Sequence, residues 1–443
     1  MQQVIPIAHD LLQHHLDDLR IADPGVASIR EIRRLIDALE SSTGVRFIRM
    51  EMGIPGLPTP EIAVKAEVAA LNEGVSASYP PAAGIPELKA ETSRFAKLFL
   101  DVSVRAEGCI PTVGSLNGSF LTFLVARSLH ADRDAVLFID PGFPVHRQQA
   151  RVLGLEARGV DIADCRGSAL EAALEEQCAG GQVAALLYSN PNNPTWMCLD
   201  ERELQVVARV ARRHDILLIE DLAYFAMDFR TELGRPGMPP FQPTAAHYTD
   251  EFVILISSSK AFSYAGQRVG MGVVSDALFA RHFPNLAHHF PFTRFGDALV
   301  LGALYAASAG VTHSAQWGLA ALLRAANDGE FDFPSYVKAY GVRASAMKTL
   351  FVSNGFHVVY DTDIDRPVGD GFYFTISWPG LSGRQLVAEL LRYGISAISL
   401  EGTGARRTEG IRACVSLVHD DQLPDLRVRL EQFAAEHEVA PQK

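Results

Sequence analysis

Residues 252–270 read FVILISSSKAFSYAGQRVG, in which an apolar run leads through serines to Lys260, and Arg268 follows eight positions later. The first five residues have the apolar, β-branched composition of a buried strand. Small serines leave room around the lysine amine, and a partly desolvated lysine amine can lose its proton and attack a carbonyl, forming a Schiff base. Lys260 is therefore a candidate nucleophile. For this residue alone, a surface lysine that follows a strand is the alternative interpretation.

Apolar runs of the same kind recur along the middle of the chain and predict its fold. Amphipathic, helix-like stretches separate the clearest runs, which lie at residues 135–139, 183–188, 216–219 and 253–256. Such runs indicate parallel strands that are buried on both faces. The sheets that they form carry functional groups at the carboxyl ends of their strands. We therefore predict an α/β fold in which helices cover both faces of a mostly parallel sheet, a three-layer αβα arrangement.

The pattern changes near residue 334 and predicts a second, smaller α/β domain. A long helix-like segment is followed by strand-like segments at residues 371–376, 395–400 and 411–415. The N-terminal segment contains helix-like and strand-like pieces that could join this domain. We predict a large domain over residues 73–330 and a small domain built from both chain ends, residues 1–72 and 331–443.

Composition limits the classes of function. The chain has 443 residues and is 48% hydrophobic, which allows a large core, and its formal net charge of -12 argues against a nucleic-acid or anionic-membrane surface. The five cysteines are scattered and show no spacing typical of metal ligands, so no metal is expected. There is no basic, apolar leader and no apolar run of membrane-spanning length, so the cytoplasm is the expected location.

The segment around Lys260 resembles the lysine signature of the class I/II (fold-type I) aminotransferase family, whose members depend on pyridoxal 5'-phosphate (PLP). Lys260, Arg268 and the aliphatic residue and glycine that follow Arg268 fit this signature. Ser258 and Tyr264 stand where the family usually has more apolar residues. The resemblance covers nearly the whole chain, and it implies the PLP-dependent transferase-like fold type I, PLP as the cofactor and a Schiff base at Lys260.

A turn of small residues, VGSLNG at 113–118, precedes an apolar helix. Such a turn presents free N–H groups to an anion, and the helix dipole adds to the attraction. By the resemblance, the residues that bind the PLP phosphate are Gly114, Ser115, Leu116, Ser257, Ser259 and Arg268.

Further turns match the contacts that the family makes with the PLP ring. Phe143, in DPGFP, matches the aromatic residue that stacks on the ring, and Asn193, in SNPNNPT, matches the asparagine that donates to the phenolic oxygen. Asp221 and Tyr224 match the D-x-A-Y pair, in which the aspartate keeps the ring nitrogen protonated and the tyrosine donates to the phenolic oxygen. Singly, the phenylalanine could pack on the core and the aspartate could cap a helix. Trp196 stands where the family usually has glycine, which indicates a different local backbone or an unusual substrate pocket.

The remaining matches concern the substrate and a second subunit. Arg412 lies in the apolar segment IRACV, where an unpaired guanidinium would be costly, and its planar fork suits an α-carboxylate. It coincides with the family's carboxylate-binding arginine, and Gly53 resembles the glycine whose backbone helps to bind the same group. Tyr79 resembles the tyrosine that reaches the phosphate of the neighbouring subunit, which implies a homodimer with shared active sites.

The resemblance implies an aminotransferase that moves an amino group from an amino acid to a keto acid through the Lys260 Schiff base. Lys260 would act as general base and acid at the α-carbon, and Asp221 would support the ring as an electron sink. A PLP-dependent lyase of the carbon–sulfur type, or a synthase on the same scaffold, is the alternative. A non-catalytic PLP-binding regulator is more distant, because the first seventy residues offer no convincing helix-turn-helix.

The identities of the amino donor and the keto acceptor do not follow from the sequence. Arg294 could bind a second carboxylate or pair with an acid on the surface, and we expect the surface ion pair. Arg406 and Arg407 could contact substrate or lie in a solvated loop. A dinucleotide-binding oxidoreductase is not supported, because no GxGxxG follows a strand.

Overall fold

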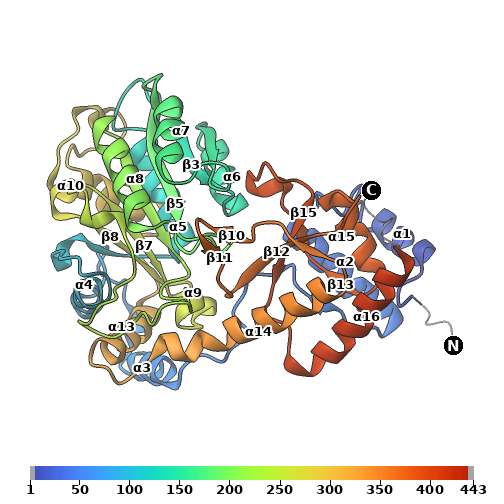
Figure 1. The fold of residues 1–443 in the computed structure, drawn as a ribbon. Coiled ribbons are helices and arrows are strands. Elements are labelled where there is room, and N and C mark those ends of the chain that lie inside the picture. The colour runs from blue at the N-terminus through green and yellow to red at the C-terminus, as the bar shows by residue number, and fades with distance from the viewer. Residues whose placement is uncertain (1–4, 438–443) are drawn as a thin grey trace. The chain divides into compact units, whose positions relative to one another are not determined.

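A computed structural model describes residues 5–437 and shows two compact units (Figure 1). The large unit holds residues 57–192 and 198–337, and the small unit holds residues 193–197 together with the chain before residue 57 and after residue 337. The sequence predicts that the large domain starts at residue 73, whereas the large unit starts at residue 57. The difference arises because helix α3 (Glu61–Asn72) packs against helix α13 (His313–Asn327) within the large unit.

The large unit is built around a seven-stranded sheet with the order β2-β8-β7-β6-β5-β3-β4. Its strands are β2 (Cys109–Thr112), β3 (Ala135–Asp140), β4 (Glu156–Asp161), β5 (Val183–Ser189), β6 (Leu217–Leu222), β7 (Val253–Ser257) and β8 (Gly270–Val274). β8 runs antiparallel to both of its neighbours, and the other pairs are parallel. The mostly parallel sheet is thus confirmed, and its strands other than the edge strand β4 are buried because helices cover both faces.

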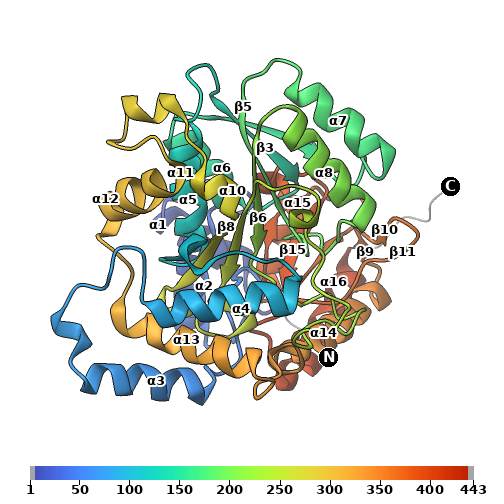
Figure 2. The ribbon, with the colours of Figure 1, turned by 90° about the vertical axis from the view of Figure 1, so that its left-hand side faces the viewer.

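Right-handed crossovers place the helices on the two faces of this sheet. The connections from β2 to β3 and from β3 to β4 progress towards one edge of the sheet, so α5 (Ser115–Ala126) and α6 (Pro144–Val152) share a face. The connections from β4 to β5 and from β5 to β6 progress in the opposite direction, so α7 (Ser168–Cys178) and α8 (Glu201–Arg213) cover the other face. Figure 2 shows the two pairs on opposite sides of the strands.

Helix α4 and several shorter elements complete the large unit. They are η1 (Val75–Ala77), α4 (Pro86–Leu100), η2 (Ala106–Gly108), η3 (Ala245–His247), α9 (Ser258–Ala261), η4 (Ala265–Gln267), α10 (Asp276–Ala280), η5 (Pro284–His288), α11 (Phe295–Asp297), the π-helix η6 (Ala298–Leu304) and α12 (Tyr305–Ser308). The core joins the apolar faces of α4, α5 and α13 to the strands. This core makes the sheet a rigid platform for the loops at its edge.

The small unit contains an antiparallel sheet of order β14-β15-β12-β9 and a separate parallel pair, β1 with β13. Its strands are β1 (Ile48–Arg49), β9 (His357–Val358), β10 (Thr362–Asp363), β11 (Arg366–Pro367), β12 (Tyr373–Ser377), β13 (Ile395–Ser396), β14 (Ile398–Ser399) and β15 (Gly410–Cys414). The strand predicted at residues 395–400 is interrupted at Ala397. The reason is that β13 pairs with β1, whereas β14 pairs with β15 in a different sheet.

Helices from both chain ends cover the strands of the small unit. They are α1 (His9–Asp18), α2 (Ile29–Thr43), α14 (Phe333–Ser353), α15 (Gly383–Arg392), η7 (Glu401–Thr403), η8 (Asp420–Gln422) and α16 (Leu423–Glu436), and the unit boundary falls within α14. The apolar faces of α1 and α2 enclose a core of their own together with Leu391 of α15. The N-terminal segment is therefore part of the small unit, as far as residue 56.

The structure also describes the state of the cysteines and the lengths of the apolar helices. The cysteines are all free thiols, and four of the five are buried. Within residues 5–437, no helix is both long enough and apolar enough to cross a bilayer.

Candidate active site

The candidate residues of the large unit lie at or after the carboxyl ends of four strands of the seven-stranded sheet. β7 leads into Lys260, β6 carries Asp221 near its end, β3 precedes Phe143 and β2 precedes Gly114. These four strands run in the same direction, because β2 and β7 are each antiparallel to β8 and the others are linked by parallel pairs. Their carboxyl ends therefore lie at one edge of the sheet, where such sheets bind ligands.

Lys260 lies on the single turn α9 rather than on the strand before it. Ser257 caps this turn, because its Oγ accepts a hydrogen bond from the Ser259 N–H at 3.1 Å. Residues 258–269, which we call the lysine loop, connect the paired antiparallel strands β7 and β8. Both ends of the lysine loop are thus fixed by the sheet.

Arg268 lies beside the turn that opens helix α5. Gly114 has a φ of +74°, and a Cβ at this position would stand 2.5 Å from Arg268 Nη2, so a larger residue would displace the guanidinium. Arg268 Nη2 also donates to the Val113 carbonyl at 3.4 Å. α5 begins at Ser115, and the first N–H groups of a helix have no acceptor within it. A fixed cation, free backbone donors and the helix dipole together form an anion site.

Asp221 is a buried carboxylate near the lysine. Burial raises the pKa of Asp221 to about 6, and the positive charge of Lys260 and the Ala223 N–H act against this rise. Asp221 Oδ1 is buried and has no hydrogen-bond partner among residues 5–437. A buried carboxylate oxygen without a donor is costly, so this atom is suited to accept a hydrogen bond from a ligand.

His146 is a further residue of this cluster that the sequence pattern did not reveal. Its Nε2 lies 3.5 Å from Asp221 Oδ2, and burial lowers the pKa of His146 to about 4, so the imidazole is neutral at pH 7. Its ring stands edge-on to that of Phe143, with the ring centroids 5.6 Å apart. The sequence does contain one indication. His146 lies three residues after Phe143, and residues at this spacing lie on the same side of a helix.

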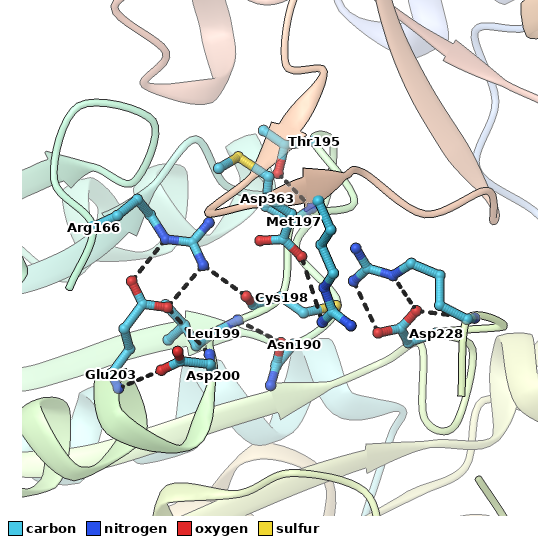
Figure 3. Close-up of polar contacts among 12 residues, drawn as sticks. Arg166, Asn190, Thr195, Met197, Cys198, Leu199, Asp200, Glu203, Asp228 and Asp363 are labelled. Atoms are coloured by element: carbon cyan, nitrogen blue, oxygen red, sulfur yellow. Dashed lines mark hydrogen bonds and ion pairs between the residues drawn. The ribbon is translucent and has the colours of Figure 1, made fainter. Parts of the chain in front are cut away.

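The turn that carries the asparagine motif is anchored on both of its sides within the large unit. The Leu199 N–H donates to Asn190 Oδ1 at 3.1 Å, and Arg166 donates to the Cys198 carbonyl at 2.9 Å. Arg166 also donates to both carboxylate oxygens of buried Glu203 at 2.7 Å (Figure 3). These bonds fix the strand exit and the start of α8, between which the turn runs.

Three of the predicted residues, Gly53, Asn193 and Arg412, belong to the small unit. Arg412 is only 1% exposed, and its Nη2 donates to the Glu51 carbonyl at 2.7 Å. Its Nε is buried and has no partner among residues 5–437. A Cβ at Gly53 would overlap the hydroxyl of Tyr373, so glycine is needed for this close approach. The buried guanidinium thus retains a donor for a ligand.

Trp196 occupies the position where the resemblance predicts glycine. Its φ of +64° explains the family's glycine, because few other residues adopt this conformation without strain. The indole is fully buried against Gly371, where a Cβ would overlap its ring, and it meets Tyr373 edge-on with the centroids 6.2 Å apart. Trp196 thus adopts a left-handed backbone conformation, and its ring fills the space beside Gly371.

Tyr79, Arg294 and Arg407 are candidates outside this cluster, whereas Tyr224 is buried. Tyr79 is 88% exposed in the loop after η1. Arg294 pairs with Glu107 at 3.2 Å and Asp297 at 3.0 Å, which agrees with a surface ion-pairing role. Arg407 donates to a main-chain carbonyl at 2.6 Å. The described residues contain no group of three or more histidine, cysteine or acidic side chains that could hold a metal ion.

Comparison with known proteins identifies the family. The model of the aminotransferase class I and II family matches residues 46–426, so the chain belongs to this family. It is 26% identical over 243 residues to an aspartate aminotransferase of Pyrococcus horikoshii, and 29% identical over 238 residues to the glutamate-pyruvate aminotransferase of Escherichia coli. These matches cover 55% and 53% of this chain, and 59% and 55% of those two proteins.

The fold comparison covers almost the whole chain. The alanine aminotransferase structure from Pyrococcus furiosus superposes with a TM-score of 0.76 and 19% sequence identity, over 95% of this chain and 99% of that one. The predicted fold-type I architecture is thereby confirmed. Membership of the family implies the use of PLP, and the site fits that cofactor, because an anion cradle, a buried carboxylate with an oxygen lacking a partner and a lysine occur at one sheet edge.

Proposed function

We propose that this chain is a PLP-dependent aminotransferase that transfers an amino group from an amino acid to a keto acid. The observation that carries the proposal is the buried Asp221 oxygen without a donor, at the sheet edge to which β7 brings Lys260. A protonated pyridine nitrogen would supply the missing hydrogen bond and the positive charge that this carboxylate needs. When bound, PLP supplies an electron sink for the bond that breaks at the α-carbon.

Each residue of the large unit then has a definite task. Lys260 would hold the cofactor through its Nζ, and its amine would serve as the general base and acid for the proton at the α-carbon. Asp221 would accept a hydrogen bond from the protonated ring nitrogen, and neutral His146 contacts the second oxygen of that carboxylate. Arg268 and the first N–H groups of α5 bind the phosphate. Phe143 packs against the ring, and Tyr224 donates to the phenolic oxygen.

We assign further residues to the substrate and to the remaining groups of the cofactor. Arg412 binds the α-carboxylate of the amino acid through its unsatisfied donor, and the backbone at Gly53 assists. Asn193 donates to the phenolic oxygen of the cofactor. Ser257 and Ser259 complete the phosphate site with their hydroxyls.

We also propose a homodimer with shared active sites. Helix α3 exposes Val64, Val68 and Leu71 at helical spacing, and Tyr79 follows in the next loop with 88% of its surface exposed. An exposed apolar stripe of this kind is typical of a protein interface. Tyr79 would reach the phosphate that is bound by the partner subunit.

The test combines adduct mapping with product analysis. The purified protein is incubated with PLP, reduced with borohydride and digested, and the modified peptide is identified by mass. We expect the adduct on Lys260 in the parent protein and none in Lys260→Ala, while the exposed Lys97→Ala variant keeps it. An adduct on another residue would overturn the assignment of the lysine.

The reaction type is tested with a panel of amino donors and keto acids. Transfer of the amino group with ping-pong kinetics supports the aminotransferase. Release of ammonia and pyruvate from a β-substituted amino acid, without transfer, would favour the carbon–sulfur lyase instead.

A further inference from the structure

The lysine loop is tied together by a residue that departs from the family signature. Ser258 Oγ donates to the Val269 carbonyl at 2.5 Å, which links the two ends of the loop. The Tyr264 N–H donates to the Ser258 carbonyl at 3.1 Å, which draws the middle of the loop to its start. Two residues of the loop, Ser263 and Arg268, have left-handed φ values of 46° and 50°. A loop with such backbone strain needs support from its surroundings.

Tyr264, the second departure from the signature, supplies a link to two helices outside the loop. Its side chain is 2% exposed, and its hydroxyl donates to Glu67 Oε2 at 2.5 Å on helix α3. Ser314 Oγ of helix α13 donates to the other oxygen of Glu67 at 3.1 Å. A hydrogen bond to a carboxylate is stronger than one between neutral groups, so this contact fixes the tyrosine ring firmly.

Helix α13 makes room for this hydroxyl with a glycine. A Cβ at Gly318 would overlap the Tyr264 hydroxyl. Glycine within a helix is destabilising relative to alanine, so its presence here needs a compensating contact. The contact with Tyr264 is such a compensation.

The segment before α3 holds the loop at a second point. Thr59 Oγ1 donates to the Ser263 carbonyl at 2.8 Å. Ser263 is one of the two left-handed residues, so the bond acts where the backbone is strained. Residues 59 and 67 thus hold adjacent residues of the lysine loop from the same side of the large unit.

We propose that Thr59, Glu67 and Tyr264 form a clamp that holds the lysine loop in the conformation that places Lys260 and Arg268 for the cofactor. Tyr264 is then a positioning residue, which acts through Lys260 near the start of the lysine loop and Arg268 near its end. The inference rests on the proposed function, because it assigns PLP to Lys260. It also makes a statement about the cofactor-free protein, namely that the clamp keeps the loop ordered.

The test compares two single variants of the full chain, Tyr264→Phe and Glu67→Gln, with the parent protein. Tyr248→Phe is the matched control. Tyr248 donates to Glu201 at 2.8 Å, so the control removes the same type of hydrogen bond from another part of the large unit. Hydrogen exchange of peptides covering residues 258–269 is measured in the cofactor-free proteins. The dissociation constant of PLP, and the pH at which the absorbance of the lysine-bound cofactor changes, are measured after addition of PLP.

We expect both clamp variants to raise exchange in residues 258–269 and to weaken PLP binding about tenfold, the factor for loss of one charge-assisted hydrogen bond. The pH of the absorbance change should shift, because the surroundings of the amine change. Tyr248→Phe should alter none of these quantities. Gly318→Ala, which displaces the same hydroxyl, should reproduce the effect.

Unchanged exchange and PLP affinity in both clamp variants would overturn the inference, as would an equal rise of exchange throughout the large unit. A different result would show that the proposed function is wrong. If the parent protein forms no adduct at Lys260, the assignment of the cofactor is wrong, yet the exchange of the cofactor-free loop still decides whether the clamp exists.

Discussion

The guanidinium of Arg412 lies over the ring of Tyr373, with its Cζ 4.6 Å from the ring centroid. The strand register explains the contact. Tyr373 pairs with Cys414 and Thr375 pairs with Arg412, so the arginine and the tyrosine lie diagonally on one face of the sheet. A planar cation held against an aromatic face keeps its orientation, which prepares it for a carboxylate.

We predict that Arg412→Lys will weaken the binding of the amino donor more than it slows turnover. A lysine lacks the planar fork and cannot stack on Tyr373 in the same way, so KM should rise at least about tenfold while kcat falls less. Steady-state kinetics with one amino donor measure both constants. Arg427→Lys is the control, because Arg427 is exposed on α16. An unchanged KM in Arg412→Lys would contradict the proposed role.

Trp196 and Gly371 should behave as a coupled pair. Gly371→Ala places a Cβ inside the indole, so we expect it to destabilise the parent protein on the order of 2 kcal/mol or more. In the Trp196→Gly background the same change should have little effect, because the ring is gone. Thermal or denaturant unfolding of the four proteins gives the coupling energy. Additive effects would show that the two residues do not share this space.

The central strands could be predicted because burial on both faces leaves a continuous apolar run in the sequence. Val253 to Ile256 is such a run, and the structure places β7 there. The lysine on a separate turn after this strand was not predicted, because the turn depends on capping by Ser257 rather than on apolar pattern. Likewise, a single apolar segment at residues 395–400 gave no sign that its two halves pair with different sheets.

The same holds for the candidate site. Residues in short motifs could be predicted from the sequence, whereas contacts between distant segments could not. Asp221 and Phe143 belong to short motifs that the sequence displays directly. The contact between His146 and Asp221 joins α6 to β6, and no local pattern encodes that distance. Glu67 is distant from the lysine loop in sequence, and its bond to Tyr264 depends on the packing of α3 against α13.

We predict that His146→Leu will weaken PLP binding several-fold. Loss of the imidazole leaves Asp221 in more apolar surroundings, which should raise the pKa of this carboxyl further and favour its neutral form. A neutral aspartate holds the ring nitrogen less well, so the PLP dissociation constant should rise, and more so at low pH. His130→Leu is a matched control, because His130 Nε2 also lies 3.5 Å from an aspartate oxygen, that of Asp215. Equal losses in the two variants would argue against a specific role.

The last prediction concerns Glu220, which precedes Asp221 on β6 and points to the other face of the sheet. It is fully buried, and Thr244 Oγ1 lies 2.7 Å and 2.9 Å from its two oxygens. Burial raises the pKa of Glu220 from 4.5 to about 7, and hydrogen bonds led by that of Thr244 oppose the rise. The folded chain therefore binds this proton more tightly than the unfolded chain does.

The sign of the pH dependence follows from this difference. Between pH 4.5 and pH 7 the folded state holds more protons at Glu220, so the free energy of unfolding falls as pH rises through that window and levels off above it. Glu220→Gln removes this contribution, and its stability relative to the parent should increase from pH 5 to pH 8 by on the order of 1–3 kcal/mol. Urea unfolding at both pH values measures the change. Glu176→Gln on the surface of α7 should show no such trend. If the Glu220→Gln difference is the same at both pH values, the carboxyl is not protonated in this range.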